Sequence, residues 1–330
     1  MKILCSISTK NRYENYLPIV IVSIANQTRK PDHFTLYDDS DSPKDLRAIE
    51  IYEHLFHLLD YKGIPWNVVF GKKSGQHNNH QTANMAGFDA VWRMDDDCSA
   101  EPDVLEKLEK HLVVGVGAVG GSILNPLMPI TDAPSFASSM IGEMDKPNKQ
   151  WFKISRTEEV DHLHCSFLYL ANIVNYDTRL SKKAHREETM FTYSLKLKGF
   201  KILITPCITW HFRSKDGGIR SDNEMSDYHH DEQVFRDWLK FKQSGKPLYV
   251  LNNGLGDNYM FLNNVKMPKG AVVATCYPEL YKEMGVELIS IADAWKITNV
   301  EAHNIYGWCA QNNWKKTMPE AIKEFYENSH

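Results

Sequence analysis

Residues 91–98, with the sequence VWRMDDDC, are the most informative stretch of this chain. A mainly apolar run typical of a buried strand leads directly into Asp95, Asp96 and Asp97. Carboxylates this close repel one another unless a cation neutralises them or their pKa values rise. Hard divalent cations such as Mg²⁺ and Mn²⁺ favour oxygen ligands of this kind, together with substrate phosphates. A solvated acidic turn would have the same sequence, so the rest of the chain has to distinguish the two interpretations.

Strand patterns and helix patterns alternate around this stretch. Apolar runs typical of strands, separated by segments typical of helices, occur at residues 2–8, 33–37, 66–70 and 90–94. This alternation predicts an α/β fold with a mainly parallel sheet covered on both faces. Ligands of such sheets bind beyond the carboxyl ends of the strands. Asp38-Asp39 follows the second strand as the aspartate triplet follows the fourth, so both acidic groups are predicted at one edge.

The chain continues in the same style to residue 243. Ser99 is expected to be the N-cap of a helix that runs to about residue 112. A proline-rich loop at residues 126–150 follows, and such loops often cover active sites. A further helix is expected from about residue 186, ended by Gly199, and a short strand leads to His211.

A polar stretch at residues 244–247 (SGKP) is expected to connect two domains, residues 1–243 and 247–330. The second domain reads as a small α/β module, in which a glycine-rich turn at residues 254–257 (GLGD) lies between a strand and a helix. Such a turn suits phosphate. It resembles the turn that opens the family 9 heptosyltransferases, which have the GT-B fold. The module is too short to be a complete enzyme of that kind, and it is interpreted as an accessory module.

The composition describes an ordinary globular protein of 330 residues, with 42% hydrophobic and 24% charged residues. A formal net charge of −4 gives no overall basic field for binding polyanions. The six cysteines lie far apart with no Cys-x-x-Cys pair, so reduced thiols are expected rather than disulfides or a zinc site. No signal peptide and no membrane-spanning run is recognisable, which favours a cytoplasmic protein.

Several motifs, taken in order, resemble the family 2 glycosyltransferases with the GT-A fold. They are residues 8–12 (STKNR), 23–28 (SIANQT), 36–40 (LYDDS), 94–97 (MDDD), 187–188 (EE) and 210–211 (WH). The resemblance covers roughly residues 2–213, and the order of the motifs makes it more specific than any one of them. It implies an enzyme that transfers a sugar from a nucleotide sugar, with UDP as the expected nucleotide.

The resemblance implies a metal site at the aspartate triplet. Asp95 and Asp97 would hold Mn²⁺ or Mg²⁺, and His211 would complete the set of ligands. A cation at this place stabilises the negative charge that gathers on the leaving pyrophosphate. The residues that the resemblance places around the nucleotide sugar, with Asp39 at the uracil and ribose, are Thr9, Arg12, Asp39, Asn84, Asp95 and Asp96.

The catalytic base is expected at Glu188, with Glu187 as the alternative. The family usually has Asp at this position, so the side chain here is longer by one methylene. A Glu with an ordinary pKa is ionised at neutral pH and can accept the proton of the attacking hydroxyl. Single displacement of this kind inverts the anomeric carbon. The plain alternative is that both acids merely favour the start of a helix.

The acceptor is open. A glycan or a lipid-linked saccharide is the default for the family. One rival is a hydroxymethylcytosine base in DNA, as for some phage glycosyltransferases. The acidic balance argues against DNA, although Lys and Arg near residues 182–186, 213–220 and 236–246 could form a local phosphate track. A second rival is a non-catalytic protein that binds a sugar or nucleotide with a degenerate transferase fold.

Overall fold

The computed structural model describes residues 1–213, 225–312 and 315–328. The chain forms two compact units, Met1–Asp231 and Glu232–His330, and the boundary falls within helix α6 (Met225–Gln243). The segment expected as a linker, residues 244–247, follows that helix. Most of residues 213–220, which were expected to contribute to a phosphate track, lie outside the described residues. Within the described part of the chain, no helix combines the length and the apolar character needed to cross a membrane.

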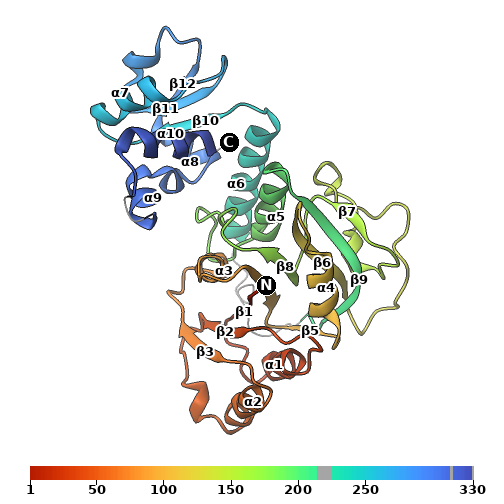
Figure 1. The fold of residues 1–330 in the computed structure, drawn as a ribbon. Coiled ribbons are helices and arrows are strands. Elements are labelled where there is room, and N and C mark those ends of the chain that lie inside the picture. The colour runs from red at the N-terminus through yellow and green to blue at the C-terminus, as the bar shows by residue number, and fades with distance from the viewer. Residues whose placement is uncertain (214–224, 313–314, 329–330) are drawn as a thin grey trace. The chain divides into compact units, whose positions relative to one another are not determined.

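The first unit is built on a 9-stranded sheet with the order β3-β2-β1-β4-β8-β6-β9-β5, in which β7 also pairs with β9 (Figure 1). Strands β1 to β4 are mutually parallel and β6 is parallel to β9, while β8 joins the two groups by antiparallel pairing. The predicted α/β class with its mainly parallel sheet is therefore confirmed. The strands are β1 (Ile3–Thr9), β2 (His33–Asp38), β3 (Trp66–Phe70), β4 (Ala90–Asp95), β5 (Cys98–Ala100), β6 (Val116–Leu124), β7 (Glu158–Val160), β8 (Phe167–Leu170) and β9 (Lys201–His211).

Helices cover both faces of this sheet. Side chains alternate along a strand, so Ile3, Cys5 and Ile7 of β1 join the core beneath α1, α2 and α4, while Leu4 joins the core beneath α3 and α5. The helices of this unit are α1 (Leu17–Ala25), α2 (Glu50–Tyr61), α3 (Gln76–Asn84), α4 (Val104–His111) and α5 (Glu187–Leu197), with short 3₁₀ turns η1 (Leu46–Ala48), η2 (Ile141–Glu143) and η3 (Lys149–Trp151).

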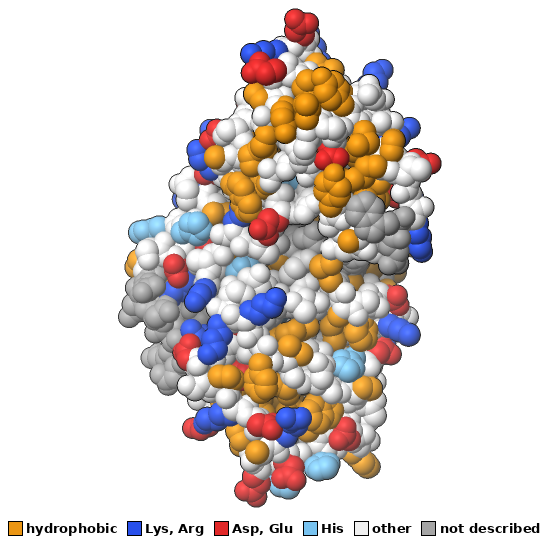
Figure 2. Space-filling model, turned by 90° about the vertical axis from the view of Figure 1, so that its left-hand side faces the viewer, with side chains coloured by type: hydrophobic (Ala, Val, Ile, Leu, Met, Phe, Trp, Pro, Cys, Tyr) orange, Lys and Arg blue, Asp and Glu red, His pale blue; other side chains and the backbone are white. Residues whose placement is uncertain are grey.

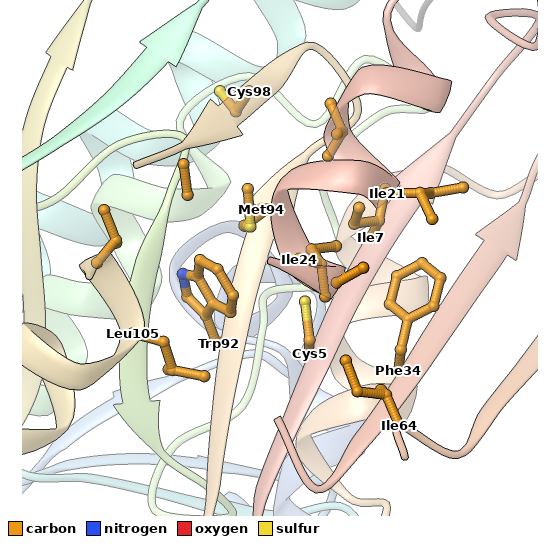
Figure 3. Close-up of a cluster of buried hydrophobic side chains, with 14 of the residues drawn as sticks. Cys5, Ile7, Ile21, Ile24, Phe34, Ile64, Trp92, Met94, Cys98 and Leu105 are labelled. Carbon is orange, nitrogen blue, oxygen red and sulfur yellow. The ribbon is translucent and has the colours of Figure 1, made fainter. Parts of the chain in front are cut away.

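Strand β4 is anchored in the larger of these two cores. Trp92 and Met94 point to the same side of the strand and pack with Ile24 of α1 and Leu105 of α4 (Figure 3). The Trp92 indole donates a hydrogen bond to Ser166 Oγ at 3.2 Å, so its one polar atom is satisfied. Burying a large apolar side chain stabilises the fold by roughly 1.5–3 kcal/mol. The packing of Trp92 and Met94 against α1 and α4 therefore fixes the position of the strand that carries the aspartates.

The prediction that Ser99 caps a helix was wrong. Ser99 lies in β5, which pairs antiparallel with the end of β9, and α4 begins only at Val104. A local capping signal was overridden by tertiary strand pairing, as happens when backbone groups find partners far away in the sequence. The consequence for the site is that Cys98 lies opposite His211.

The second unit has a parallel sheet of three strands in the order β10-β11-β12, with a core around Tyr249, Phe261 and Tyr326. It is the small α/β module that the sequence predicts. Its elements are β10 (Leu248–Leu251), α7 (Leu255–Asn264), β11 (Val272–Thr275), η4 (Pro278–Tyr281), β12 (Glu287–Ile289), α8 (Ile291–Ile297), η5 (Val300–His303), α9 (Ile305–Gln311) and α10 (Met318–Asn328).

The glycine-rich turn of this unit is closed by its own carboxylate. Asp257 accepts a hydrogen bond from the Gly254 backbone N–H at 3.2 Å and from the Tyr306 hydroxyl at 2.8 Å. The carboxylate thus occupies the N-terminal end of α7, where an anionic phosphate would otherwise be attracted. The turn that suits phosphate in the sequence acts here as a helix cap.

Candidate active site

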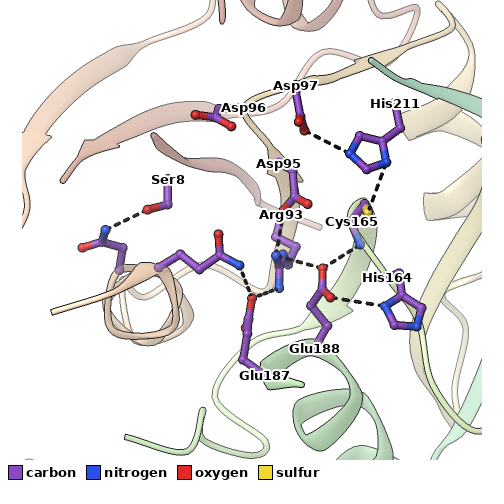
Figure 4. Close-up of polar contacts among 12 residues, drawn as sticks. Ser8, Arg93, Asp95, Asp96, Asp97, His164, Cys165, Glu187, Glu188 and His211 are labelled. Atoms are coloured by element: carbon purple, nitrogen blue, oxygen red, sulfur yellow. Dashed lines mark hydrogen bonds and ion pairs between the residues drawn. The ribbon is translucent and has the colours of Figure 1, made fainter. Parts of the chain in front are cut away.

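The site lies at the carboxyl ends of β1, β2 and β4, where polar and acidic side chains meet (Figure 4). Ser8 of β1 is the register partner of Asp95, the last residue of β4. Thr9 pairs with Asp38 in the neighbouring strand, and the Asp39 N–H donates to the Thr9 carbonyl at 2.9 Å. The two acidic groups therefore share one edge of the sheet.

Asp96 is held by two residues of the first loop. Its carboxylate accepts from Thr9 Oγ1 at 2.7 Å and from Arg12 Nη1 at 2.6 Å. The same guanidinium nitrogen lies 2.8 Å from Asp97 Oδ2. Burial raises the pKa of Asp96 to about 6, although the positive charge of Arg12 works in the opposite direction. Thr9, Arg12 and Asp96, all expected around the nucleotide, bond to one another in this structure.

Asp97 and His211 form the next pair. His211 Nε2 lies 3.4 Å from Asp97 Oδ1, because the end of β9 pairs with β5. Burial acts to raise the pKa of Asp97, but the hydrogen bond with His211 and the charges of His211 and Arg12 lower it overall. For His211, burial acts to lower the pKa, because it disfavours the charged imidazolium. The interactions with Cys165 and Asp97 outweigh burial and raise the pKa of His211 to about 11.

Arg93 organises the third group of acids. Its side chain is 0% exposed, and its guanidinium lies 2.7 Å from Glu187 Oε1, 2.9 Å from Asp95 Oδ1 and 3.1 Å from Glu188 Oε1. It also lies over the ring of Phe167, its register partner in β8, at 5.3 Å. A single buried cation therefore connects the base candidates with the metal candidate.

The two glutamates at the start of α5 differ in their surroundings. Glu187 is 1% exposed and accepts a hydrogen bond from Gln76, whereas Glu188 is 13% exposed and accepts one from the Cys165 N–H at 2.7 Å. Burial raises the pKa of Glu187 to about 7. Burial acts on Glu188 too, but Arg93, His164 and the Cys165 N–H outweigh it, so the pKa of Glu188 is lowered. The pair is thus divided into one acid that titrates near neutrality and one that stays ionised.

Asp39 lies where the end of β2 meets the loop after β3. It is 4% exposed and accepts a hydrogen bond from the Lys73 backbone N–H at 3.2 Å. A Cβ on Gly71 would lie 1.8 Å from Asp39 Oδ1, so only glycine leaves room for this carboxylate. Asp38 has a different environment, since it accepts hydrogen bonds from the Tyr13 hydroxyl and from the Ser40 N–H.

Asn84, expected on the donor-sugar side, lies at the end of α3 and is 1% exposed. Its amide nitrogen donates to the Val174 carbonyl at 2.9 Å and its amide oxygen accepts from the Asn172 N–H at 2.9 Å. In this structure the side chain holds the loop after β8. A contact with a sugar would have to replace one of those hydrogen bonds.

The acidic side chains offer a donor set for a hard divalent cation. Ligand atoms of Asp95, Asp97 and Cys98 lie within 4.8 Å of one another, and His211 lies beside Asp97. In an octahedral shell with bonds of about 2.1 Å, adjacent ligands are roughly 3 Å apart. The 3.4 Å between Asp97 and His211 is close to that spacing. Asp95 and Asp97 therefore offer the oxygen ligands that Mg²⁺ or Mn²⁺ prefers, and the spacing of Asp97 and His211 suits two adjacent ligands of one ion.

Sequence reasoning missed three contributors to this site. Arg93 was passed over, although a cation inside an otherwise apolar strand is a recognisable signal that buried acids lie nearby. Cys98 and Cys165 are far apart in the sequence, and only the fold brings both sulfurs beside His211. No local motif could have indicated that meeting.

Comparisons with known proteins show the family and the fold of the first unit. A model of glycosyl transferase family 2 matches residues 5–169. GalNAc-T7 with UDP, GalNAc and Mn²⁺ is similar in structure, with a TM-score of 0.53 and 12% identity over 73% of this chain and 50% of that one. TarS 1-349 of S. aureus with UDP-GlcNAc has a TM-score of 0.50 and 13% sequence identity, and the match covers 72% of this chain and 66% of that one. No curated protein matches the sequence.

A longer TarS of S. aureus gives a TM-score of 0.47 and 14% identity, and the chain covers 37% of it. This chain thus spans 37 to 66% of the length of these three solved structures. At such low identity the likeness concerns the fold. The family model covers half of the chain, with most of β1, all of β2 to β7 and most of β8, including the aspartate triplet. The chain is therefore a member of glycosyl transferase family 2.

Proposed function

We propose that this protein transfers a sugar from a UDP-sugar to an acceptor hydroxyl, with a bound divalent cation and with inversion at the anomeric carbon. The observation that carries the proposal is that Asp39, which bonds to the end of β1, lies at the same edge of the sheet as the aspartate triplet and Glu188, the last two of which Figure 4 shows together. Parallel sheets bind ligands at this edge. A nucleotide pocket, a metal site and a base are the three components that such a transfer needs.

The donor is assigned to the side of the site formed by β1 and β2. Asp39 is the side chain for the uracil and ribose, since its carboxylate can accept hydrogen bonds from N–H and hydroxyl groups. The solved structures of GalNAc-T7 and TarS that share the fold contain UDP or UDP-GlcNAc. They support UDP as the nucleotide, while the sugar stays open.

Asp95, Asp97 and His211 are proposed to hold Mn²⁺ or Mg²⁺. When bound, the cation would supply electrostatic stabilisation of the charge that develops on the leaving diphosphate. Arg12 adds a fixed positive charge beside Asp96 and Asp97, and it limits the repulsion between them.

Glu188 is proposed as the base that accepts the proton of the acceptor hydroxyl. It is the more exposed glutamate of the pair, and its pKa is lowered, so it is ionised at neutral pH. The Cys165 N–H and His164 orient the carboxylate. Glu187, buried against Arg93 and Gln76, is proposed to position Arg93.

The acceptor is proposed to be the hydroxyl of a saccharide, free or linked to a lipid. Acidic and basic side chains are interspersed over the face shown in Figure 2, and the formal net charge is −4. A duplex with one phosphate charge per roughly 1.7 Å favours a continuous basic surface. DNA is therefore the rival acceptor. Retention of the protein on a DNA column that weakens as salt rises would favour it.

The first experiment is thermal-shift binding of UDP, GDP, TDP and ADP, each with and without Mn²⁺. We expect a shift with UDP that requires Mn²⁺ and is lost in Asp97→Asn. In assays of donor turnover, Glu188→Gln should lose activity while still binding UDP, and the matched variant Glu187→Gln should retain more of it. Absence of any nucleotide shift would refute the proposal. Equal activity in Glu188→Gln and wild type would refute the assignment of the base.

A further inference from the structure

Two thiols lie against the proposed metal site without a role in the transfer. One ligand atom each of Cys98, Cys165 and His211 lie within 4.8 Å of one another. Cys98 is in β5, opposite His211 in β9, and Cys165 precedes β8. Cys165 has a positive φ of 56°, which non-glycine residues seldom adopt, and its sulfur lies 4.0 Å from His211 Nδ1.

The two ring nitrogens of His211 have different neighbours. Its Nε2 atom faces Asp97 and its Nδ1 atom faces Cys165, as Figure 4 shows. Nε2 thus has a carboxylate oxygen as its neighbour and Nδ1 a sulfur, although Asp95 lies near both sulfurs as well. The two sides therefore suit ions of different character, because hard cations select oxygen and softer ones select thiolate and imidazole.

The thiol side has the donors and the spacing of a tetrahedral zinc site. With Zn–S bonds of about 2.3 Å, two sulfurs in a tetrahedral shell are roughly 3.8 Å apart. The three ligand atoms already lie within 4.8 Å, so a small contraction would suffice. Asp95, which pairs with Arg93, is a candidate for the fourth ligand, since it falls within the same 4.8 Å limit in one group with Cys98 and in another with Cys165.

We propose that Cys98, Cys165 and His211 form a sulfur-containing site that binds Zn²⁺, and that this ion competes with the oxygen-bound cation of the proposed function. Zinc binds two thiolates and a neutral imidazole, so any proton still held by Cys98, Cys165 or the ligating nitrogen of His211 is released to solvent. A neutral imidazole has one free lone pair, so His211 can serve one ion at a time. With Nδ1 on zinc, the Nε2–H donates to Asp97, the carboxylate–histidine–zinc arrangement common in zinc proteins.

The test uses the metal-free, reduced full-length chain without nucleotide, titrated with Co²⁺ as a spectroscopic substitute for Zn²⁺. We expect a thiolate-to-cobalt charge-transfer band, displaced by Zn²⁺. It should be lost in Cys98→Ser/Cys165→Ser and retained in Cys276→Ser, which removes an exposed thiol elsewhere. Zinc affinity in the double variant should fall by more than the roughly 10–100-fold typical of losing an outer partner of a ligand. Stoichiometric Co²⁺ binding without that band would overturn the proposal.

A second measurement does not depend on the variants folding. Zn²⁺ should protect Cys165, the partly exposed thiol of the pair, from alkylation in the wild-type chain, read by peptide mass spectrometry, while the exposed Cys276 reacts as before. Equal labelling with and without Zn²⁺ would also overturn the site. Competition is read from the electron paramagnetic resonance signal of free Mn²⁺, which Zn²⁺ should increase. Protected thiols with unchanged Mn²⁺ binding would overturn the competition alone, and failure of Mn²⁺ to bind at all would count against the proposed function.

Discussion

Replacing Arg93 by Met tests whether one buried guanidinium keeps the acidic site folded. The substitution retains most of the aliphatic packing but leaves Glu187, Asp95 and Glu188 without their shared cation, which lies 2.7–3.1 Å from them. Removing one partner of a buried ion pair costs about 3–5 kcal/mol. In a unit of this size each kcal/mol lowers Tm by roughly 2–4 °C. We therefore expect a Tm lower by on the order of 10 °C.

The assay is calorimetric unfolding of wild type, Arg93→Met and a matched control, Arg47→Met. Arg47 also pairs with an aspartate, Asp45, but its side chain is 67% exposed and the pair is screened by solvent, so its loss should lower the Tm far less. The difference between Arg93→Met and wild type should shrink towards low pH, where the stranded carboxylates take up protons. A loss no greater than that of the control at neutral pH would refute the reasoning.

Three further outcomes are expected. Gly71→Ala should displace the Asp39 carboxylate and weaken UDP binding at least ~10-fold. The control Gly142→Ala, whose added Cβ has no atom within 4 Å, should leave UDP binding unchanged. Isothermal titration calorimetry measures both affinities. Burial raises the pKa of Glu187 from 4.5 to about 7, so its contribution to stability is complete below pH ~4.5 and lost as pH rises through about 7. Urea unfolding of Glu187→Gln should lack that decline, worth roughly 3 kcal/mol. Tyr306→Phe removes a donor to the α7 cap and should lower stability by about 1 kcal/mol in the same assay.

The sequence predicted the parts of the fold that depend on local periodicity. Strands β1 to β4 are short apolar runs followed by polar turns, so their order and their shared acidic edge could be read from the chain. Asp39, Asp95 and Asp97 directly follow or end such runs, and the structure brings them to one edge.

The rest depends on pairings between distant segments. β5 was read as a helix cap because Ser99 looks like one locally, and its true partner is more than 100 residues away. The contacts of Arg93 with the α5 glutamates, and the meeting of Cys98 with Cys165, need β8 and α5 to be in place. Neither set of contacts produces a hydrophobic periodicity that could be recognised in the sequence.

Because β5 pairs with β9, the candidate site contains one segment that is translated early and one that is translated about 100 residues later. The triplet is made early, but His211, which sits beside Asp97, is the last residue of the last strand of the large sheet. A chain interrupted before that strand would have an acidic loop without its histidine. Under the proposed function, such a chain would lack one of the three proposed ligands of the cation.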